Sequence, residues 1–309
     1  MGRRKKGKHI NGWCIIDKPA GLTSTQVVNK TRWAFDAQKA GHAGTLDPDA
    51  TGLLAVALGE ATKIIPFVTG ALKAYHFTVS FGQATTTDDA SGEILKKSDL
   101  RPSASQIQKE LGSFIGHIQQ VPPQFSAVKV AGERAYDLAR DGEDFALKPR
   151  SLYVESLSLL SQNDANHADF ELVCGKGGYV RSIARDLGEK LGCYGHVKTL
   201  RRLWSGPFDI GQAHSVDELE QMAKSPEILS LLTPLEDGLG DLPQVRCSNS
   251  VVPMVQNGNP VPALMSTQDT LSYGDACWLE NGNKALALGH YRSGHFHPSR
   301  VFVYDPASS

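Results

Sequence analysis

The chain contains one stretch that decides how the rest is interpreted, Gly41-His42-Ala43-Gly44-Thr45-Leu46-Asp47-Pro48-Asp49-Ala50-Thr51-Gly52-Leu53-Leu54. Its glycines permit backbone angles closed to other residues and let a second molecule approach closely. Pro48 biases Asp47 toward an extended conformation, which presents the carboxylate to its surroundings. Asp followed by Pro is also a common helix start, and in that reading Asp47 caps a helix beginning at Pro48. Residues 52–59 predict a short buried strand closed by glycine, so any helix that begins at Pro48 would be brief.

Length and composition place the chain among globular proteins with two domains. It has 309 residues, of which 40% are hydrophobic and 21% are charged. The sequence has no apolar run as long as a membrane span and no apolar signal segment at its N-terminus. We therefore expect a cytoplasmic protein without a membrane partner. The five cysteines are scattered and lack a C-x-x-C pair, which indicates reduced thiols.

Hydrophobic periodicity predicts the secondary structure, because alternating or continuous apolar runs favour strands and apolar residues three or four apart favour helices. The strands expected on this basis are 12–19, 52–59, 73–82, 150–154 and 168–174. The helices expected are one that is capped by Thr23 or Ser24 and ends before Gly41, and those at 60–68, 103–114, 132–143 and 180–191. Short strands are also expected at Val245, Val251-Val252, Val261, 277–279, 285–288 and 301–304.

The stretch that contains Asp47 resembles a known family. Residues 44–54, continuing to Gly59-Glu60-Ala61-Thr62-Lys63, are similar to the signature of bacterial tRNA pseudouridine synthase B, the pseudouridine-55 synthase. The other matching motifs are Lys18-Pro19 with Gly21 and Thr23-Ser24, Pro122-Pro123 with Ser126-Ala127, Gly177-x-Tyr179-x-Arg181, and Leu200-Arg201-Arg202. The resemblance covers roughly residues 12 to 210, with the motifs in the same order.

The resemblance implies an active site built on Asp47. In the family, the Asp of the Thr-Leu-Asp-Pro motif is the catalytic residue, and an arginine that corresponds to Arg181 pairs with it. A guanidinium group can hold a carboxylate by two parallel hydrogen bonds and keep it ionised. Apart from the resemblance, a surface Arg181 bonded to Asp186 or Glu189 on its own helix is a common arrangement.

The resemblance also implies a set of residues around the target base. Tyr75 corresponds to a tyrosine that lies against the uracil, and an aromatic face can stack on any base. His42 matches a histidine that fills the stack vacated by the flipped nucleotide. The further substrate-binding residues expected are Tyr179, Leu200, Lys18, Lys63 and Arg202. From the residues alone, Tyr75 is an ordinary strand tyrosine, His42 a solvated turn residue and Lys18 a structural residue, and Arg202 holds a neighbouring acid.

The charge balance is unusual for an enzyme that acts on RNA. The formal net charge is −1, whereas phosphate contacts normally leave a basic imprint. The positive charge must therefore be concentrated locally. Residues 1–8 contain five Lys and Arg, and Lys198, Arg201 and Arg202 form a second group. A basic arm that contacts RNA and a solvated tail are both open interpretations of residues 1–8.

Two polar clusters could suggest metal binding. Asp88 and Asp89 lie in a polar turn at 82–92 that lacks the ligand order of a calcium hand, so we expect them to be structural. His290, His295 and His297 are expected to be exposed turn residues. We predict no metal.

The reaction implied by the resemblance isomerises uridine in tRNA without a cofactor. It cleaves the N1–C1′ bond, rotates the base and rejoins it through C5. A carboxylate suits this chemistry because it can attack a carbon or remove a sugar proton while it stabilises positive charge at C1′. Two other classes stay open. One is a tRNA-binding folding factor, or RNA chaperone, in which catalysis is secondary; the other is a glycoside hydrolase, which generally needs a second acid.

The expected fold class is α+β. The resemblance implies a pseudouridine synthase fold with a central mixed, mainly antiparallel sheet flanked by helices, plus a small C-terminal β-barrel of the PUA kind. The domains expected are a basic arm at 1–11, a catalytic domain at 12–240 with an insertion or thumb at about 121–150, and a PUA-like RNA-binding domain at 241–309. The partner expected is the T-loop and T-stem of tRNA, without a guide RNA, and the chain is expected to be a monomer.

Overall fold

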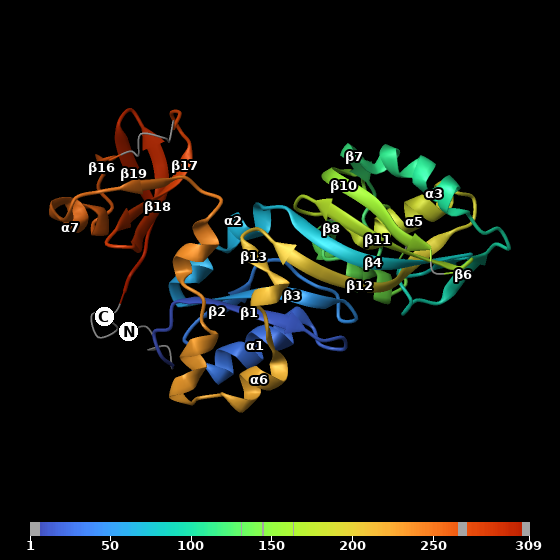
Figure 1. Ribbon diagram of the computed structural model, residues 1–309, viewed down its shortest axis with the longest axis horizontal. Helices are drawn as coiled ribbons and strands as arrows, with labels where there is room; N and C mark the ends of the chain where they lie inside the picture. The colour runs from blue at the N-terminus through green and yellow to red at the C-terminus, as the bar shows by residue number, and fades with distance from the viewer. Residues whose placement is uncertain (1–6, 131, 144, 163, 265–270, 305–309) are drawn as a thin grey trace. The chain divides into compact units, whose positions relative to one another are not determined.

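The computed structural model describes residues 7–130, 132–143, 145–162, 164–264 and 271–304. The chain divides into two compact units. Unit 1 consists of Met1–Pro48, Leu53–Thr69 and Gly206–Ser309, and unit 2 consists of Asp49–Gly52 and Gly70–Ser205. Strand β3 (Thr51–Leu58) contributes to both, because its first two residues belong to unit 2 and the others to unit 1. Figure 1 shows the helices and strands of both units, many of them labelled.

Unit 1 is built on strands that are buried on both faces. The strand order is β14 (His214–Ser215), β1 (Gly12–Lys18) and β3, with β2 (Ala40–His42) antiparallel to β3. Alternate residues of β3 enter two different cores: Leu53, Ala55 and Ala57 enter one, and Leu54, Val56 and Leu58 enter the other. This double burial explains the continuous apolar run of β3, and the predicted strand is confirmed.

Helical elements cover the two faces of these strands. The first core includes residues of η1 (Gly59–Lys63) and η5 (Leu235–Leu239), and the second includes residues of α1 (Ser24–Ala34) and α6 (Val216–Gln221). Thr23 caps α1 in a reciprocal capping box with Gln26, as one of the two predicted caps. The remaining short elements before residue 241 are α2 (Ile65–Gly70), β13 (Phe208–Asp209), η3 (Ile210–Gln212) and η4 (Pro226–Leu231).

Unit 2 is a mixed, mainly antiparallel sheet with helices packed against it. From β3 the strand order continues through β12 (Gly195–Ser205), β4 (Lys73–Phe81), β11 (His167–Cys174), β10 (Arg150–Gln162) and β7 (Gly116–Gln120). The β3–β12 pair is parallel, and the pairs from β12 to β7 are antiparallel. Helix α5 (Val180–Lys190) packs against β12 and β4, and α3 (Ala104–Leu111) packs against β10. The predicted α+β class and sheet type are therefore confirmed.

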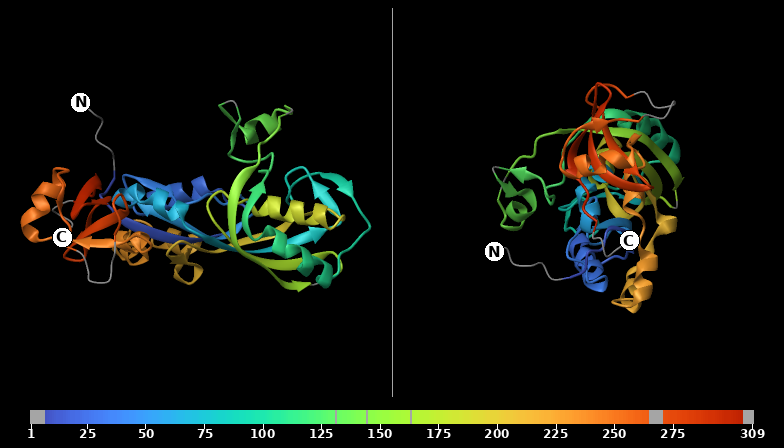
Figure 2. Two further views of the ribbon diagram at one scale, coloured as in Figure 1. Left: turned by 90° about the horizontal axis from the view of Figure 1, so that it is seen from above. Right: turned by 90° about the vertical axis from the view of Figure 1, so that its left-hand side faces the viewer.

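The segment from residue 121 to 150 begins irregularly after paired prolines, as expected, and then forms small elements. These are β8 (Lys129–Val130), β9 (Glu133–Arg134) and α4 (Ala135–Arg140). Figure 2 shows them standing away from the sheet of unit 2. The helix predicted for 132–143 is therefore shorter than expected, because its first residues pair with β8. A second hairpin, β5 (Gln83–Thr85) and β6 (Ile94–Lys97), flanks the polar turn, and η2 (Gly112–Phe114) follows α3.

The chain after residue 241 forms a five-stranded sheet. Its order is β15 (Gln244–Arg246), β17 (Ala276–Asn281), β18 (Lys284–Arg292), β19 (His295–Val301) and β16 (Val261–Pro262). The backbones of Arg246 and Leu264 form one isolated antiparallel bridge, which joins the two edges at a point. The structure thus has a curled sheet where the sequence predicted a small barrel.

Three local predictions were wrong or incomplete. Val251-Val252 does not form a strand: η6 (Asn249–Val251) and α7 (Val252–Gln256) occupy this position, because Pro253 suits the first turn of a helix. The helix predicted for 60–68 is split into η1 and α2. The three histidines lie on strands rather than in turns, His290 on β18 and His295 and His297 on β19.

The described residues give two further observations about class. No helix among them is both long enough and apolar enough to span a bilayer. All five cysteines are buried free thiols, as expected.

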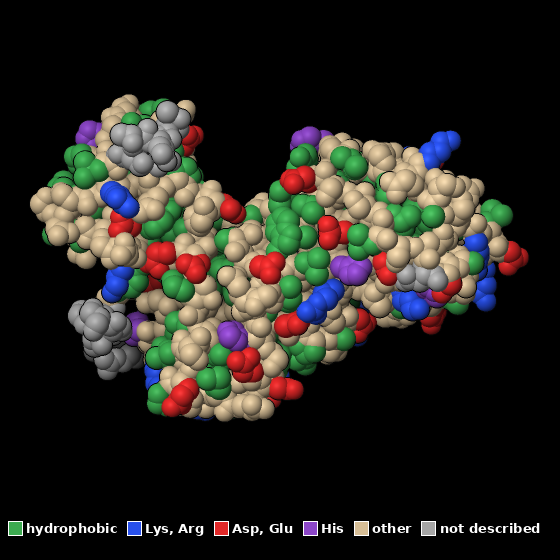
Figure 3. Space-filling model, in the orientation of Figure 1, with side chains coloured by type: hydrophobic (Ala, Val, Ile, Leu, Met, Phe, Trp, Pro, Cys, Tyr) green, Lys and Arg blue, Asp and Glu red, His purple; other side chains and the backbone are tan. Residues whose placement is uncertain are grey.

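Figure 3 shows the Lys and Arg side chains of one face in small separate groups among Asp and Glu. Positive charge is therefore dispersed on that face.

Candidate active-site residues

The loop that carries Asp47 is held on its N-terminal side by Ser24. The Ser24 hydroxyl accepts a hydrogen bond from the Leu46 amide at 2.9 Å and donates one to the Leu46 carbonyl at 3.0 Å. Both residues are buried, with exposed fractions of 2% and 4%. The peptide groups that precede Asp47 are therefore fixed to the first turn of α1. The sequence did not predict this contact, since it indicated Ser24 as a possible helix cap and as part of a motif.

The loop is held on its C-terminal side by Lys18 and Gly21. The Lys18 ammonium group is fully buried and donates to the carbonyl oxygens of Pro48 at 2.8 Å, Leu22 at 2.7 Å and Pro19 at 2.9 Å. The Gly21 amide also donates to the Pro48 carbonyl at 2.9 Å. Three carbonyl dipoles stabilise the buried ammonium group, and in return it ties the loop to the end of β1. This geometry supports the structural role that was the alternative for Lys18.

Asp47 itself is half-buried between these two anchored residues. Pro48 and Asp49 form only a turn, so the interpretation of Asp47 as the cap of a helix beginning at Pro48 was wrong. Gly44 adopts a φ of +102°, a conformation that L side chains rarely adopt. The backbone on both sides of Asp47 is thus fixed.

His42 and Lys63 also belong to unit 1. His42 is half-buried at the end of β2, where it pairs with Val56 of β3. The Lys63 ammonium group donates to Glu60 and to the carbonyl of Val301, and Glu60 accepts a bond from the amide of Val303. Lys63 therefore ties the end of β19 to η1, a role that the sequence did not predict.

Tyr75 and Arg202 lie opposite each other on β4 and β12 of unit 2. The Arg202 guanidinium group donates a hydrogen bond to the Tyr75 hydroxyl, and the exposed fractions of the two residues are 1% and 8%. Burial lowers the pKa of Arg202 from its ordinary value, and Tyr75 opposes this effect. Arg202 therefore lies inside the protein beside Tyr75, a contact that the sequence did not predict.

Gly52 explains how β3 approaches β12 at this point. It adopts a φ of +98°, and a Cβ atom added to it would lie 2.3 Å from the carbonyl oxygen of Arg202. Contacts this short are not tolerated, so the register in which Gly52 pairs with Arg202 requires glycine. Gly52, the last glycine of the stretch that contains Asp47, thus fixes the register of the strand that carries Arg202.

Lys73, two residues before Tyr75 on β4, is a buried cation beside Arg202. Its exposed fraction is 5%, and its ammonium group donates to the carbonyl of Ala71 at 2.7 Å. Burial, with the positive charge of Arg202, lowers the pKa of Lys73 from 10.5 to about 8. A lysine so perturbed changes its charge close to neutral pH.

Arg181 is the second residue of helix α5 and is buried, with an exposed fraction of 6%. Its guanidinium group donates to the carbonyls of Thr87 at 2.9 Å and Phe125 at 3.0 Å, and lies 3.7 Å from an Asp89 carboxylate oxygen. The alternative of a surface arginine bonded to its own helix was therefore wrong. Arg185 instead forms an ion pair with Asp186 of its own helix, and a second ion pair with Asp88 of the polar turn.

The polar turn at 82–92 has the structural role that was expected of its Asp and Thr residues. The carboxylate of Asp89 accepts bonds from the Thr87 hydroxyl at 2.6 Å and from the Ser91 amide at 3.0 Å. Because the turn is ordered from within, its carbonyl at Thr87 is held in place for Arg181. Among the described residues, no group of three or more His, Cys, Asp or Glu could hold a metal ion.

Tyr179 and Leu200 complete the predicted set in unit 2, and both are half-buried. The Gln120 side chain, itself 3% exposed, accepts from the Tyr179 amide at 2.9 Å and donates to the Tyr179 carbonyl at 3.1 Å. Leu200 pairs with Phe77 across β12 and β4, and its carbonyl accepts from the Thr51 hydroxyl. The role of Gln120 was not predicted from the sequence.

Comparisons with known proteins agree with these motifs. Residues 32–180 match the TruB family pseudouridylate synthase (N terminal domain), and residues 181–240 match the tRNA pseudouridylate synthase B C-terminal domain. The tRNA pseudouridine synthase B of Roseobacter denitrificans is 59% identical over 301 residues, which cover 97% of this chain and 98% of that protein. The enzyme of the same name from Brucella anthropi is 45% identical, over 98% of this chain and 99% of that protein.

Solved structures show the same fold. An H/ACA RNP bound to a substrate RNA containing 2′-deoxyuridine includes a chain that superposes with a TM-score of 0.75 at 22% identity, over 98% of this chain and 92% of that one. A chain of a Cbf5-Nop10-Gar1 complex superposes with a TM-score of 0.74 at 25% identity, over 96% of this chain and 85% of that one. On the sequence matches over nearly its whole length, this chain belongs to the TruB family of pseudouridylate synthases.

Proposed function

We propose that this chain isomerises uridine to pseudouridine in tRNA, at position 55 of the T-loop, with Asp47 as the catalytic carboxylate. The observation that carries the proposal is the anchoring of Asp47. Ser24 fixes the backbone before it, and Lys18 and Gly21 fix the carbonyl after it. A reacting carboxylate needs such a fixed direction, because small displacements of a catalytic group cost large factors in rate.

The chemistry conserves the atoms of the nucleotide apart from one exchanged proton. The N1–C1′ bond breaks, the base rotates and a C5–C1′ bond forms, after which C5 loses its proton to water and N1 gains one. No oxidant, reductant or energy source enters this balance, so we expect no cofactor. The carboxylate of Asp47 stabilises positive charge at C1′, and attack on carbon and removal of a sugar proton are both open to it.

The other residues of the site have proposed roles in holding the flipped nucleotide. Tyr75 is proposed to lie against the uracil, and its bond from Arg202 fixes the orientation of its hydroxyl. Tyr179 and Leu200 are proposed to line the uracil pocket, and His42 to occupy the vacated stack. The pairing of Arg181 with the carboxylate stays a prediction from the resemblance. For Lys18, Lys63 and Arg202, the contacts described above favour positioning roles over direct contacts with RNA.

The division of the chain and its cellular context are proposed as follows. Residues 1–11 form a basic arm, 12–240 a catalytic domain with an insertion at about 121–150, and 241–309 an RNA-binding domain of the PUA kind. The curled five-stranded sheet supports the last assignment, since its edges meet at the Arg246–Leu264 bridge. The chain acts in the cytoplasm as a monomer on the T-loop and T-stem, without a guide RNA. The enzymes that resemble it over their whole length favour catalysis over the folding-factor alternative.

The test compares Asp47→Asn with Asp49→Asn, because Asp49 is an exposed acid in the same turn. The substrate is a full-length tRNA transcript whose uridines are tritiated at C5, and turnover is measured as tritium released to water. We expect Asp47→Asn to abolish release while the Kd for the transcript stays within about threefold, and Asp49→Asn to keep the parental rate. A transcript with cytidine at position 55 should release no tritium. Parental turnover by Asp47→Asn would refute the catalytic role.

A further inference from the structure

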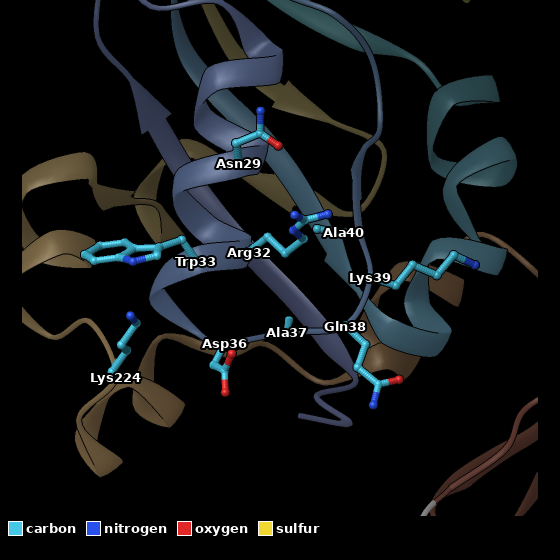
Figure 4. A pocket seen from close by; sticks show the side chains of 9 residues that line it. All are labelled: Asn29, Arg32, Trp33, Asp36, Ala37, Gln38, Lys39, Ala40 and Lys224. Carbon is cyan, nitrogen blue, oxygen red and sulfur yellow. The ribbon is translucent and has the colours of Figure 1, made fainter. Parts of the chain in front are cut away.

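A hollow of about 660 Å³ lies at the C-terminal end of α1 in unit 1. Figure 4 shows Trp33 and Lys224 on one side of it, Arg32 in the middle and Lys39 on the other side. Its volume falls within the range of about 300–1,000 Å³ that is typical of sites for small ligands. The hollow is therefore large enough to receive a nucleotide.

Trp33 is a large aromatic side chain that does not join the core. Its exposed fraction is 51%, whereas the buried residues of α1 are Ser24, Val27, Val28, Thr31 and Ala34. The ammonium group of Lys224 lies 5.0 Å from the centre of the indole ring. An exposed indole beside a cation is the combination that proteins use to stack the bases of single-stranded nucleic acid and contact the adjoining phosphate.

The backbone fixes both residues in place. The amides of Asp36 and Ala37 bond to the carbonyls of Trp33 and Arg32, and Asp36 adopts a φ of +49°, which closes α1 with a Schellman motif. Lys224 adopts a φ of +62°, and its amide donates to the Ala34 carbonyl at 2.8 Å. The aromatic ring and the cation are therefore brought together before any ligand binds.

The hollow is basic although the chain is not. Arg32, Lys39 and Lys224 give three positive charges and Asp36 one negative charge, a balance of +2, whereas the whole chain has −1. Cations at a helix C-terminus also stabilise its dipole. That explanation is insufficient here, because the Schellman bonds already satisfy the carbonyls of Arg32 and Trp33. The surplus of positive charge in this hollow favours an anionic ligand.

The N-terminal arm joins the fold beside this hollow. The Gln38 side chain donates to the carbonyl of Gly7 at 2.9 Å, and the amides of Lys8 and Gln38 bond to the carbonyls of Asp36 and Lys8. In the sequence, Gly7 directly follows Arg3-Arg4-Lys5-Lys6. Gly7 and Lys8, which follow these basic residues in the sequence, therefore contact two residues that line the hollow, Asp36 and Gln38.

We propose that this hollow, defined by Arg32, Trp33, Lys39 and Lys224, binds a single-stranded RNA segment as a second contact outside the Asp47 loop. One base stacks on Trp33, and the three cations contact phosphates, while the side-chain amide of Asn29 can bond the base edge. Ser24, which holds the Asp47 loop, lies at the opposite end of α1, and 11 helical residues span about 16 Å. In assigning RNA as the ligand, the inference rests on the proposed function.

The test uses octaadenylate, a labelled single-stranded RNA that contains no uridine and so cannot be isomerised. Its binding to the full chain is measured by fluorescence anisotropy at several salt concentrations. We expect Trp33→Ala to raise the Kd about tenfold and Trp33→Phe, which keeps a stacking face, to raise it less than threefold. Lys224→Gln should raise the Kd and reduce the salt slope by about 0.7, the value for one phosphate on a single strand.

The matched control is Lys30→Gln. Lys30 is a lysine of the same helix that forms an ion pair with Glu220 and does not line the hollow, so its loss should leave the Kd within twofold. The thermal unfolding midpoint of each variant is measured to exclude loss of folding. With full-length tRNA, Trp33→Ala should raise KM without changing kcat. Absent binding of octaadenylate, or equal Kd values for the parent, Trp33→Ala and Lys224→Gln, would overturn the inference whatever the fate of the Asp47 test.

Discussion

The hydroxyl of Ser24 satisfies both backbone polar groups of Leu46, at 2.9 Å from its amide and 3.0 Å from its carbonyl. Leu46 is the residue directly before Asp47. The neighbouring hydroxyl, that of Thr23, has a different partner: it caps α1 by accepting from the Gln26 amide. Two adjacent hydroxyl groups therefore divide two tasks, one fixing the loop and the other fixing the helix.

This division predicts that Ser24→Ala and Thr23→Ala will have separable effects. Ser24→Ala leaves a buried amide and carbonyl without their partner, which costs about 1–3 kcal/mol of unfolding free energy. It also releases the backbone beside Asp47, and we expect kcat for tRNA to fall about 10- to 100-fold. Thr23→Ala removes a helix cap at a cost of about 1 kcal/mol, with kcat unchanged. Urea unfolding and tritium release at saturating tRNA measure the two quantities. Equal kcat values for both variants would contradict the proposed role of Ser24.

Local sequence patterns predicted much of the fold. The sequence predicts β3 because it is a continuous apolar run, and it predicts α1 and α5 because their apolar residues recur at helical spacing. Strand β12 was not assigned, because Lys198, Arg201 and Arg202 interrupt its apolar pattern. Val251-Val252 predicts a strand, because β-branched residues favour strands, but Pro253 in the first turn of α7 favours a helix there.

The resemblance predicts residues of the site, and the structure adds contacts that hold the backbone near them. Family resemblance gave Asp47, Tyr75 and Arg181, because motifs are local in sequence. The contacts that fix the backbone near these motifs join residues remote in the sequence. Ser24 lies 22 positions from Leu46, and Gln120 lies 59 positions from Tyr179. No local period or composition encodes such pairs, since the fold alone decides which distant backbone groups meet a side chain.

The bond between Tyr75 and Arg202 predicts that the hydroxyl and the ring of Tyr75 have different roles. Tyr75→Phe removes a hydrogen-bond partner of a guanidinium group that is only 1% exposed, and we expect the unfolding free energy to fall by about 1–3 kcal/mol. The ring stays available to lie against the base. Tyr75→Leu should lose similar stability and, in addition, reduce kcat for tRNA by at least about tenfold.

Unfolding in urea and turnover of a full-length transcript separate these effects. Tyr153→Phe is the control, because Tyr153 lies on β10, is 42% exposed and is not part of the Tyr75–Arg202 pair. It should change neither quantity. Equal turnover of Tyr75→Phe and Tyr75→Leu would show that the ring itself contributes nothing to catalysis.

Lys73 predicts how the stability of the chain depends on pH. Burial and the charge of Arg202 lower its pKa in the folded protein to about 8, while the unfolded chain keeps the ordinary value of 10.5. Between these two values the unfolded state binds the proton and the folded state does not, so the unfolding free energy rises with pH. The contribution of Lys73 to the unfolding free energy is complete above pH 10.5 and is lost as the pH falls through about 8.

We therefore expect the unfolding free energy of the parent, relative to Lys73→Met, to increase from pH 7 to pH 10. Methionine has a similar length and no charge, so the difference between the two proteins isolates Lys73 from the other groups that titrate in this window. Lys30→Met is the control, because Lys30 is partly exposed and paired with Glu220, and its curve should run parallel to that of the parent. Urea unfolding at half-unit pH steps measures the three curves. A pH-independent difference between the parent and Lys73→Met would mean that Lys73 is solvated in the folded protein, with an ordinary pKa.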